Sequence, residues 1–114
     1  MKKVDYTIVF VSDMSRSVKF YRDVMGFPLK FECSKWTEFA TEGTTLALHP
    51  AERTPAGSCQ PGLVVDNMGD FHRSMIQKGV RCLMPPTMQD FGSPLALYAD
   101  PDGMVFSVIE TPKK

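Results

Sequence analysis

The side chains best suited to chemistry in this sequence lie close together in its first half: Trp36, Glu38 and His49. An imidazole exchanges a proton near neutral pH, and a carboxylate on the same surface can orient it or hold a cationic ligand. Trp36 can form part of an aromatic pocket for a flat or hydrophobic molecule, together with Tyr6, Phe31 and Tyr98. This pattern predicts a small-molecule site with His49 and Glu38 as candidate catalytic residues.

Each of these residues also has a purely structural interpretation. His49 precedes Pro50 at the end of an apolar run, where it can be a partly solvated strand terminus. Glu38 can pair with a nearby Lys or Arg instead of a ligand. The aromatic residues can equally form core or a subunit interface. His72 lies in a helical pattern beside Phe71, and a structural role is the better interpretation for it.

Composition excludes several partner classes. Thirteen basic and thirteen acidic residues cancel within 114 residues, so we expect neither nucleic acid nor a membrane surface as a partner. The three cysteines, Cys33, Cys59 and Cys82, form no CxxC pair, which argues against a disulfide framework or structural zinc. Free thiols and the absence of a long apolar stretch predict a cytoplasmic protein.

An internal repeat organises the chain. The sequence VSDM at 11–14 opens one amphipathic segment, and VDNM at 65–68 opens another, 54 residues later. Each follows a short apolar run and ends at a glycine, Gly26 or Gly79. Such repetition indicates two copies of one folding unit. We therefore predict a single domain over 1–114, with module one at 1–52, a linker at about 50–59 and module two at 60–114.

Each module is predicted to contain one helix and four strands, in the order βαβββ, which makes the fold class α+β. The helices are expected over about 14–25 and 67–78, with Ser12, Asp13 or Ser15 as the first cap. Pro85 and Pro86 should end a strand, so that 85–94 forms either a lid or a plain surface connection. The strands are expected at 4–11, 29–34, 36–41, 44–49, 61–66, 80–84, 95–99 and 104–110.

Strand alternation predicts which residues share a face. A Glu42-Gly43 turn pairs Phe39 with Leu46, which places both on the side of the first helix. The opposite face, toward a cleft, then carries Tyr6, Ile8, Phe10, Trp36, Glu38, Ala47 and His49. A four-residue turn at 100–103 places Leu95, Leu97, Phe106 and Val108 toward the second helix, and Ala96, Tyr98, Ser107 and Ile109 toward the cleft.

Two passages resemble a known family. The segment DMSRSVKFYRDVMGF at 13–27 is similar to the first-helix signature of the vicinal oxygen chelate superfamily, the glyoxalase, bleomycin-resistance and extradiol dioxygenase group. The segment DPDGMVFSVIE at 100–110 is similar to its last hairpin. The resemblance covers essentially the whole chain. It implies paired βαβββ modules forming a curved mixed sheet around a cleft, and it implies a homodimer.

The resemblance also implies where a metal would bind. Metal-dependent members of this superfamily use four His or Glu side chains, and those positions fall here on Tyr6, Ala47, Gln60 and Ser107. These residue types do not make a divalent-metal site, so we predict no metal and no other cofactor. A metal site shifted toward His49 is the alternative. Gln60 and Ser107 can instead hydrogen-bond a ligand.

Three functions follow, because one scaffold of this kind supports many. The first is a metal-free protein that binds a small aromatic or amphipathic molecule. The second is an enzyme, either a metal-dependent glyoxalase-like lyase, isomerase or dioxygenase, or an acid–base catalyst using His49 and Glu38. The third is a partner-binding module whose cleft is filled by its own side chains.

Overall fold

The computed structural model describes residues 3–112 and divides the chain into two compact units. The N-terminal unit comprises Asp5–Cys59. The C-terminal unit runs from Gln60 onward and also includes Lys3 and Val4. Both units contain one sheet with helix on one of its faces, and each is described below by itself.

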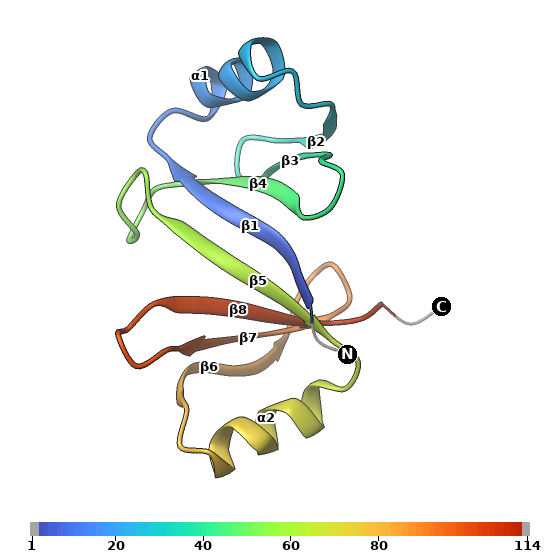
Figure 1. Cartoon of the computed structure of the whole chain (residues 1–114), viewed down its shortest axis with the longest axis vertical. Helices are drawn as coiled ribbons and strands as arrows, with labels where there is room; N and C mark the ends of the chain where they lie inside the picture. The colour runs from blue at the N-terminus through green and yellow to red at the C-terminus, as the bar shows by residue number, and fades with distance from the viewer. Residues whose placement is uncertain (1–2, 113–114) are drawn as a thin grey trace. The chain divides into compact units, whose positions relative to one another are not determined.

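The N-terminal unit has the predicted βαβββ order, with its elements at β1 (Lys3–Val11, from Asp5 onward in this unit), α1 (Met14–Lys19), η1 (Phe20–Val24), β2 (Leu29–Glu32), β3 (Thr37–Phe39) and β4 (Thr45–Pro50). Its strands lie in the order β2-β3-β4-β1 (Figure 1). The strands β1 and β4 are parallel, and the other neighbours are antiparallel. The η1 segment is a π-helical turn that extends α1, a feature that the apolar spacing did not predict.

The C-terminal unit repeats this arrangement, with β5 (Cys59–Val65), α2 (Met68–Gln77), β6 (Arg81–Met88), β7 (Pro94–Ala99) and β8 (Val105–Glu110). Its strand order is β6-β7-β8-β5, again with one parallel pair, β5 and β8 (Figure 1). The registers also correspond. Ile8 pairs with Ala47 of β4, and Gly62, which lies 54 residues after Ile8, pairs with Ser107 of β8. The predicted α+β fold of two βαβββ modules is confirmed.

The repeated cap residues start both helices. The carboxylate of Asp13 accepts a hydrogen bond from the Arg16 amide at 3.0 Å, and the Asn67 side chain accepts one from the Asp70 amide at 2.9 Å. Such bonds satisfy amides that have no partner within the helix. Gly26 and Gly79 follow the helical segments with φ of 78° and 74°, a backbone conformation that favours glycine.

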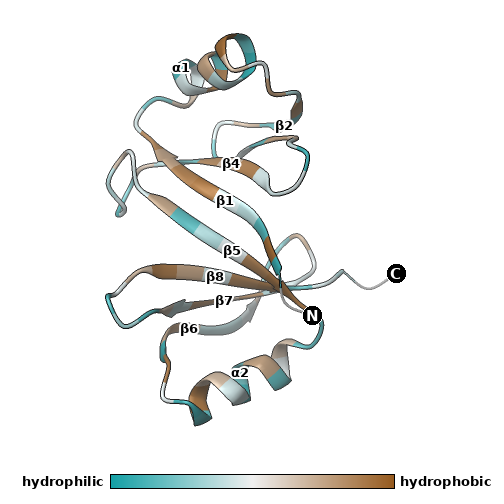
Figure 2. Cartoon of the chain, viewed as in Figure 1, coloured by the Kyte–Doolittle hydropathy of each residue, from teal (hydrophilic) through white to brown (hydrophobic). Residues whose placement is uncertain are grey.

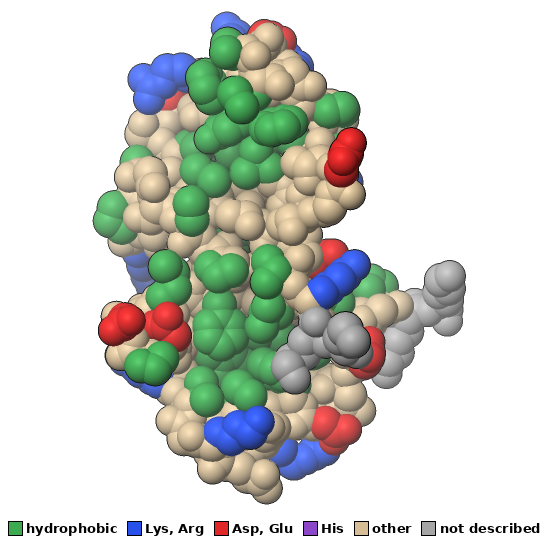
Figure 3. All heavy atoms as spheres, in the orientation of Figure 1, with side chains coloured by type: hydrophobic (Ala, Val, Ile, Leu, Met, Phe, Trp, Pro, Cys, Tyr) green, Lys and Arg blue, Asp and Glu red, His purple; other side chains and the backbone are tan. Residues whose placement is uncertain are grey.

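Each unit has its own apolar core between helix and sheet. In the N-terminal unit it contains Val11, Val18, Phe39 and Leu48, and in the C-terminal unit Val65, Met68, Phe71, Ala96, Tyr98 and Val108. Figure 2 shows hydrophobic residues concentrated in the strands and alternating with hydrophilic ones along α2. Figure 3 shows hydrophobic side chains gathered over the strands of each unit, with charged groups around their margins. This packing fixes which face of each sheet is left for other contacts.

The prediction that Pro85 and Pro86 end a strand is wrong. The strand β6 continues through both residues to Met88 with shifts in its register, as is possible for prolines at the edge of a sheet. The remaining connection is a tight turn, in which the Gln89 amide donates to the Ser93 carbonyl at 3.1 Å. Residues 85–94 therefore form the end of an edge strand and a short turn, and not the long loop on which the lid interpretation depended.

Candidate functional site

The sheet face opposite α1 carries the candidate residues of the N-terminal unit. We call it the Trp36 face and define it by Tyr6, Phe10, Trp36, Glu38, Ala47 and His49. Its register is as predicted: Phe39 pairs with Leu46 and Glu38 with Ala47. Because neighbouring residues along a strand point to opposite faces, Phe39 enters the core beneath α1 while Glu38 faces away from it.

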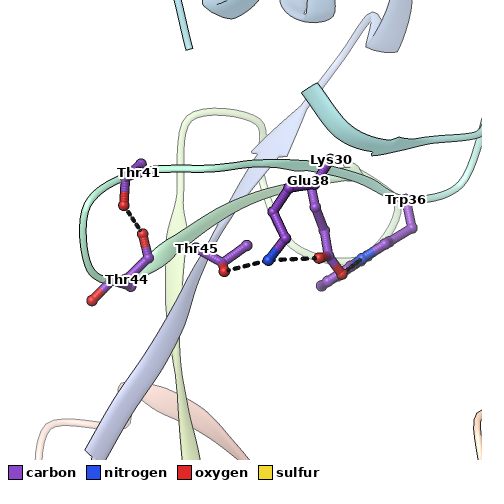
Figure 4. A network of polar contacts seen from close by, with 6 residues as sticks. All are labelled: Lys30, Trp36, Glu38, Thr41, Thr44 and Thr45. Carbon is purple, nitrogen blue, oxygen red and sulfur yellow. Dashed lines mark hydrogen bonds and ion pairs between the residues drawn. The ribbon is translucent and has the colours of Figure 1, made fainter. Parts of the chain in front are cut away.

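Glu38 is the centre of a polar network on this face (Figure 4). The Trp36 indole N–H donates a hydrogen bond to Glu38 Oε2 at 2.7 Å, and Lys30 Nζ lies 3.7 Å from Glu38 Oε1. Lys30 Nζ also donates to Thr45 Oγ1 at 3.1 Å. The carboxylate thus has a cationic partner of its own, and its main local effect is to hold the indole ring in one orientation.

Two further aromatic rings border Trp36. Tyr6 packs edge-on against it, with ring centroids 6.4 Å apart and an angle of 75° between the planes. His49 also packs edge-on against Trp36, with ring centroids 6.3 Å apart and an angle of 80°. Phe31 pairs with Glu38 across β2 and β3 and leaves 53% of its surface exposed. The predicted aromatic residues of this unit therefore share one face, with Trp36 in the middle.

His49 is oriented by the backbone and not by Glu38. Its Nδ1 lies 2.7 Å from the carbonyl oxygen of Pro50, and its ring contacts Phe10 at a centroid distance of 5.5 Å. The carboxylate of Glu38 contacts Trp36 and Lys30. The two candidate catalytic residues thus lie on one face, but they do not form a hydrogen-bonded pair.

Lys30 and Thr45 belong to this network, and the sequence did not reveal them. A register shift in β2 between Leu29 and Phe31 brings the Lys30 ammonium to the side of Glu38. Such a bulge places two successive residues against one partner residue. Regular strand alternation would place Lys30 on the opposite face from Phe31. The sequence pattern therefore gave no indication that Lys30 contacts Glu38.

In the C-terminal unit, the predicted orientation of β7 is wrong. The turn holds five residues, because the Asp100 carboxylate accepts bonds from the amides of Asp102 and Met104, at 2.9 and 2.8 Å. Tyr98 therefore pairs with Phe106, and Leu97 pairs with Ser107. A slip of one residue moves every side chain of a strand to the other face. The predictions for Phe106, Val108, Ser107 and Ile109 hold, whereas those for Leu95, Ala96, Leu97 and Tyr98 are reversed.

Tyr98, predicted to bind ligand, is instead a fully buried core residue beneath α2. Its ring packs against Phe71, and its hydroxyl lies 2.8 Å from Nδ1 of His72. This contact gives His72 the structural role expected for it. Gln60 and Ser107 occupy β5 and β8, and the register Gly62–Ser107 places both on the face opposite α2.

Burial raises the pKa of Tyr98 from its ordinary value of 10 to about 12, with the Cys82 thiolate as a smaller cause. The unfolded chain loses the Tyr98 proton at a lower pH than the folded protein does. This group therefore leaves the free energy of unfolding unchanged below pH 10 and lowers it as the pH rises toward 12. We expect an alkaline loss of about 1–3 kcal/mol from this group. Unfolding measured between these pH values should show a steeper loss in the wild type than in Tyr98→Phe, and equal slopes would contradict the assignment.

Comparison of the two repeats shows where polar chemistry is concentrated. The registers place Leu95, Leu97 and Ile109 at the positions of Trp36, Glu38 and His49. These positions are equivalent in the two sheets, and the C-terminal unit folds with aliphatic side chains at all three. The polar and aromatic residues of the N-terminal unit are therefore not demanded by the fold, which makes the Trp36 face the candidate site.

The bond between Trp36 and Glu38 is open to a direct test. We expect Glu38→Leu to lower the free energy of unfolding by about 1–2 kcal/mol, because the part-buried indole N–H loses its acceptor. The matched variant Glu38→Gln keeps an acceptor oxygen and loses only the exposed pair with Lys30, so it should cost less than about 1 kcal/mol. Urea unfolding measures both. Equal losses in the two variants would show that the ion pair, and not the indole bond, matters.

The donor set does not fit the metal that the fold implies. The positions Tyr6, Ala47, Gln60 and Ser107 offer a phenol, a methyl group, an amide and a hydroxyl, whereas divalent metals in such sites take imidazole, carboxylate or thiolate. Within residues 3–112, no group of three or more His, Cys, Asp or Glu side chains is placed to hold an ion.

Comparisons with known proteins assign the family. The family model of the glyoxalase/bleomycin resistance protein/dioxygenase superfamily matches residues 3–108, and the chain belongs to this superfamily. No curated protein matches the sequence. Among the helices of residues 3–112, none has the length and apolarity needed to cross a membrane.

Solved structures share the fold at low sequence identity. A hypothetical protein from Bacillus halodurans C-125 has a TM-score of 0.81 and 13% identity, covering 99% of this chain and 96% of its own. A superfamily member from Vibrio splendidus 12B01 has a TM-score of 0.77 and 17% identity, covering 93% of this chain and 97% of its own. Methylmalonyl-CoA epimerase from Mycobacterium tuberculosis has a TM-score of 0.79 and 17% identity, covering 96% of this chain and 87% of its own. At these identities the likeness establishes the fold alone.

Proposed function

We propose that this protein binds a small aromatic or amphipathic molecule on the Trp36 face without the help of a metal ion. The observation that carries the proposal is the orientation of Trp36. Its indole N–H bond to Glu38 and its edge contacts with Tyr6 and His49 hold the ring before any ligand arrives. A binding group held in advance loses less conformational entropy when the ligand binds.

The charges on this face suit an amphipathic ligand better than a strongly ionic one. Lys30 and Glu38 lie 3.7 Å apart and offset each other, and the whole chain has no net charge. Neither the site nor the protein therefore attracts a highly charged molecule over distance. The exposed Phe31 ring adds apolar contact area at the edge strand.

The fluorescence of Trp36, the single tryptophan of the chain, tests the proposal. A panel of aromatic compounds, chosen so as not to absorb at the excitation wavelength, is titrated into the protein with and without a chelator. We expect saturable changes in emission that are unaffected by the chelator. Saturable binding that disappears with the chelator would instead support the metal-dependent lyase, isomerase or dioxygenase. Absence of binding throughout the panel would favour a partner-binding module.

Acid–base catalysis by His49 is the second candidate function, and the fixed position of its ring favours it. The Pro50 carbonyl accepts a hydrogen bond from Nδ1, which leaves Nε2 of the neutral ring with the lone pair that a general base needs. If the protein is an enzyme, it should turn over a bound compound, and His49→Ala should abolish this turnover while binding persists. If it is a binding protein, neither the wild type nor the variant should show turnover.

A further inference from the structure

We infer that the ligand of the Trp36 face carries a hydrogen-bond donor on an aromatic ring, a phenolic O–H or a ring N–H, and that Nε2 of His49 accepts this bond. The inference rests on the proposed function and specifies the class of molecule that the site takes. It follows from the tautomer of the neutral His49 ring that the Pro50 carbonyl selects.

The contact with Pro50 determines which nitrogen of His49 carries the proton. A carbonyl oxygen can only accept a hydrogen bond, so an Nδ1 atom 2.7 Å from the Pro50 oxygen must be the donor. In the neutral imidazole, a proton on Nδ1 leaves Nε2 with a lone pair. The neutral His49 ring therefore offers Nε2 as a hydrogen-bond acceptor to a ligand.

The surroundings of His49 leave that acceptor to a ligand. Its ring lies between Phe10 and Trp36, at centroid distances of 5.5 and 6.3 Å, and neither neighbour offers a donor to Nε2. The Trp36 N–H is taken by Glu38 Oε2. Within residues 3–112, the hydrogen bond of the His49 ring is the one at Nδ1, and the side chain is only part-buried.

The position of this acceptor beside an aromatic ring defines the ligand class. A molecule in contact with the Trp36 ring brings its own edge within reach of His49, because the two rings are neighbours. A donor on that edge replaces the water that would otherwise bond Nε2. A ligand with only an ether oxygen there leaves the lone pair without a partner, and sites built around a hydrogen bond discriminate against such analogues. Phenols and indole-like compounds satisfy this acceptor, and their O- or N-methylated forms leave it without a partner and bind more weakly.

The test compares naphthol with methoxynaphthalene, which share the ring system and differ in the donor. Binding is measured by calorimetry and by the NMR shift of the single tryptophan indole N–H. We expect naphthol to bind about threefold to tenfold more tightly. His49→Asn keeps a side-chain donor near Pro50 but places no acceptor at the Nε2 position, and it should abolish the preference. His49→Phe, which keeps a ring and has no acceptor, should do the same.

The outcomes separate this inference from the proposed function. If both compounds bind equally to the wild type, the inference is overturned while aromatic binding on this face stands. If neither binds, the proposed function fails and the inference with it. Nitrogen NMR of His49 provides an independent check that does not depend on ligand choice: a proton on Nε2 of the neutral ring would overturn the inference, and a proton on Nδ1 supports it.

Discussion

Replacing Tyr98 with alanine is expected to lower the free energy of unfolding by about 3–5 kcal/mol, the range for deleting a buried aromatic side chain. Its side chain is fully buried between the sheet and α2, and it packs against Phe71 and Phe106. Removal leaves a cavity and also takes the hydroxyl partner of His72 away. Chemical denaturation of the wild type and the variant measures the loss.

The neighbouring variant Leu97→Ala is the matched control for this prediction. Leu97 lies on the same strand, pairs with Ser107 and faces away from α2. It is only part-buried, so its truncation should cost clearly less than that of Tyr98. If Leu97→Ala were the more damaging change, β7 would have the register of a four-residue turn. Tyr98→Phe isolates the hydroxyl and should cost only about 1 kcal/mol.

The second large effect is expected for Trp36→Leu, which should weaken binding of an aromatic ligand at least about tenfold. The variant removes the aromatic surface that the proposed site is built around, and ring contacts of this kind contribute roughly 0.5–1.5 kcal/mol beyond their apolar area. Leucine suits the position, because Leu95 occupies the equivalent place in the C-terminal unit. Calorimetry measures the affinity, since the variant has no tryptophan to report it.

Two controls make the result for Trp36 interpretable. Trp36→Phe keeps an aromatic ring and loses only the bond to Glu38, so it should retain more affinity than Trp36→Leu. Ile76→Ala alters an exposed apolar residue of α2 in the other unit and should leave the affinity unchanged. An unaltered affinity in Trp36→Leu would exclude this face as the aromatic site.

The internal repeat made most of the fold predictable. The cap residues Asp13 and Asn67 recur 54 residues apart, each before an amphipathic segment, and local hydrogen bonds of this kind depend little on distant parts of the chain. The Glu42-Gly43 turn was equally informative. Its length set the pairing of β3 with β4, and with it the faces of Trp36, Glu38 and His49.

The prediction for β7 failed because the length of a turn depends on hydrogen bonds that residue types alone do not specify. The DPDG sequence correctly indicated a turn. Met104 also belongs to the turn because of two hydrogen bonds. The Asp100 carboxylate accepts one from the Met104 amide, and the Asp100 amide donates the other to the Met104 carbonyl. One added residue moved Tyr98 from the predicted ligand site into the core.

By itself, the sequence determined the α+β class, the two modules, the helix boundaries near their caps and the grouping of Trp36, Glu38 and His49 on one face. These features follow from periodicity and short-range hydrogen bonds. Only the tertiary structure decided which partners these side chains take. Lys30 reaches Glu38 through a bulge, and the Pro50 carbonyl orients His49. The physical reason is that side-chain contacts depend on register and bulges, in which a shift of one residue reverses a face while the pattern of residue types stays the same.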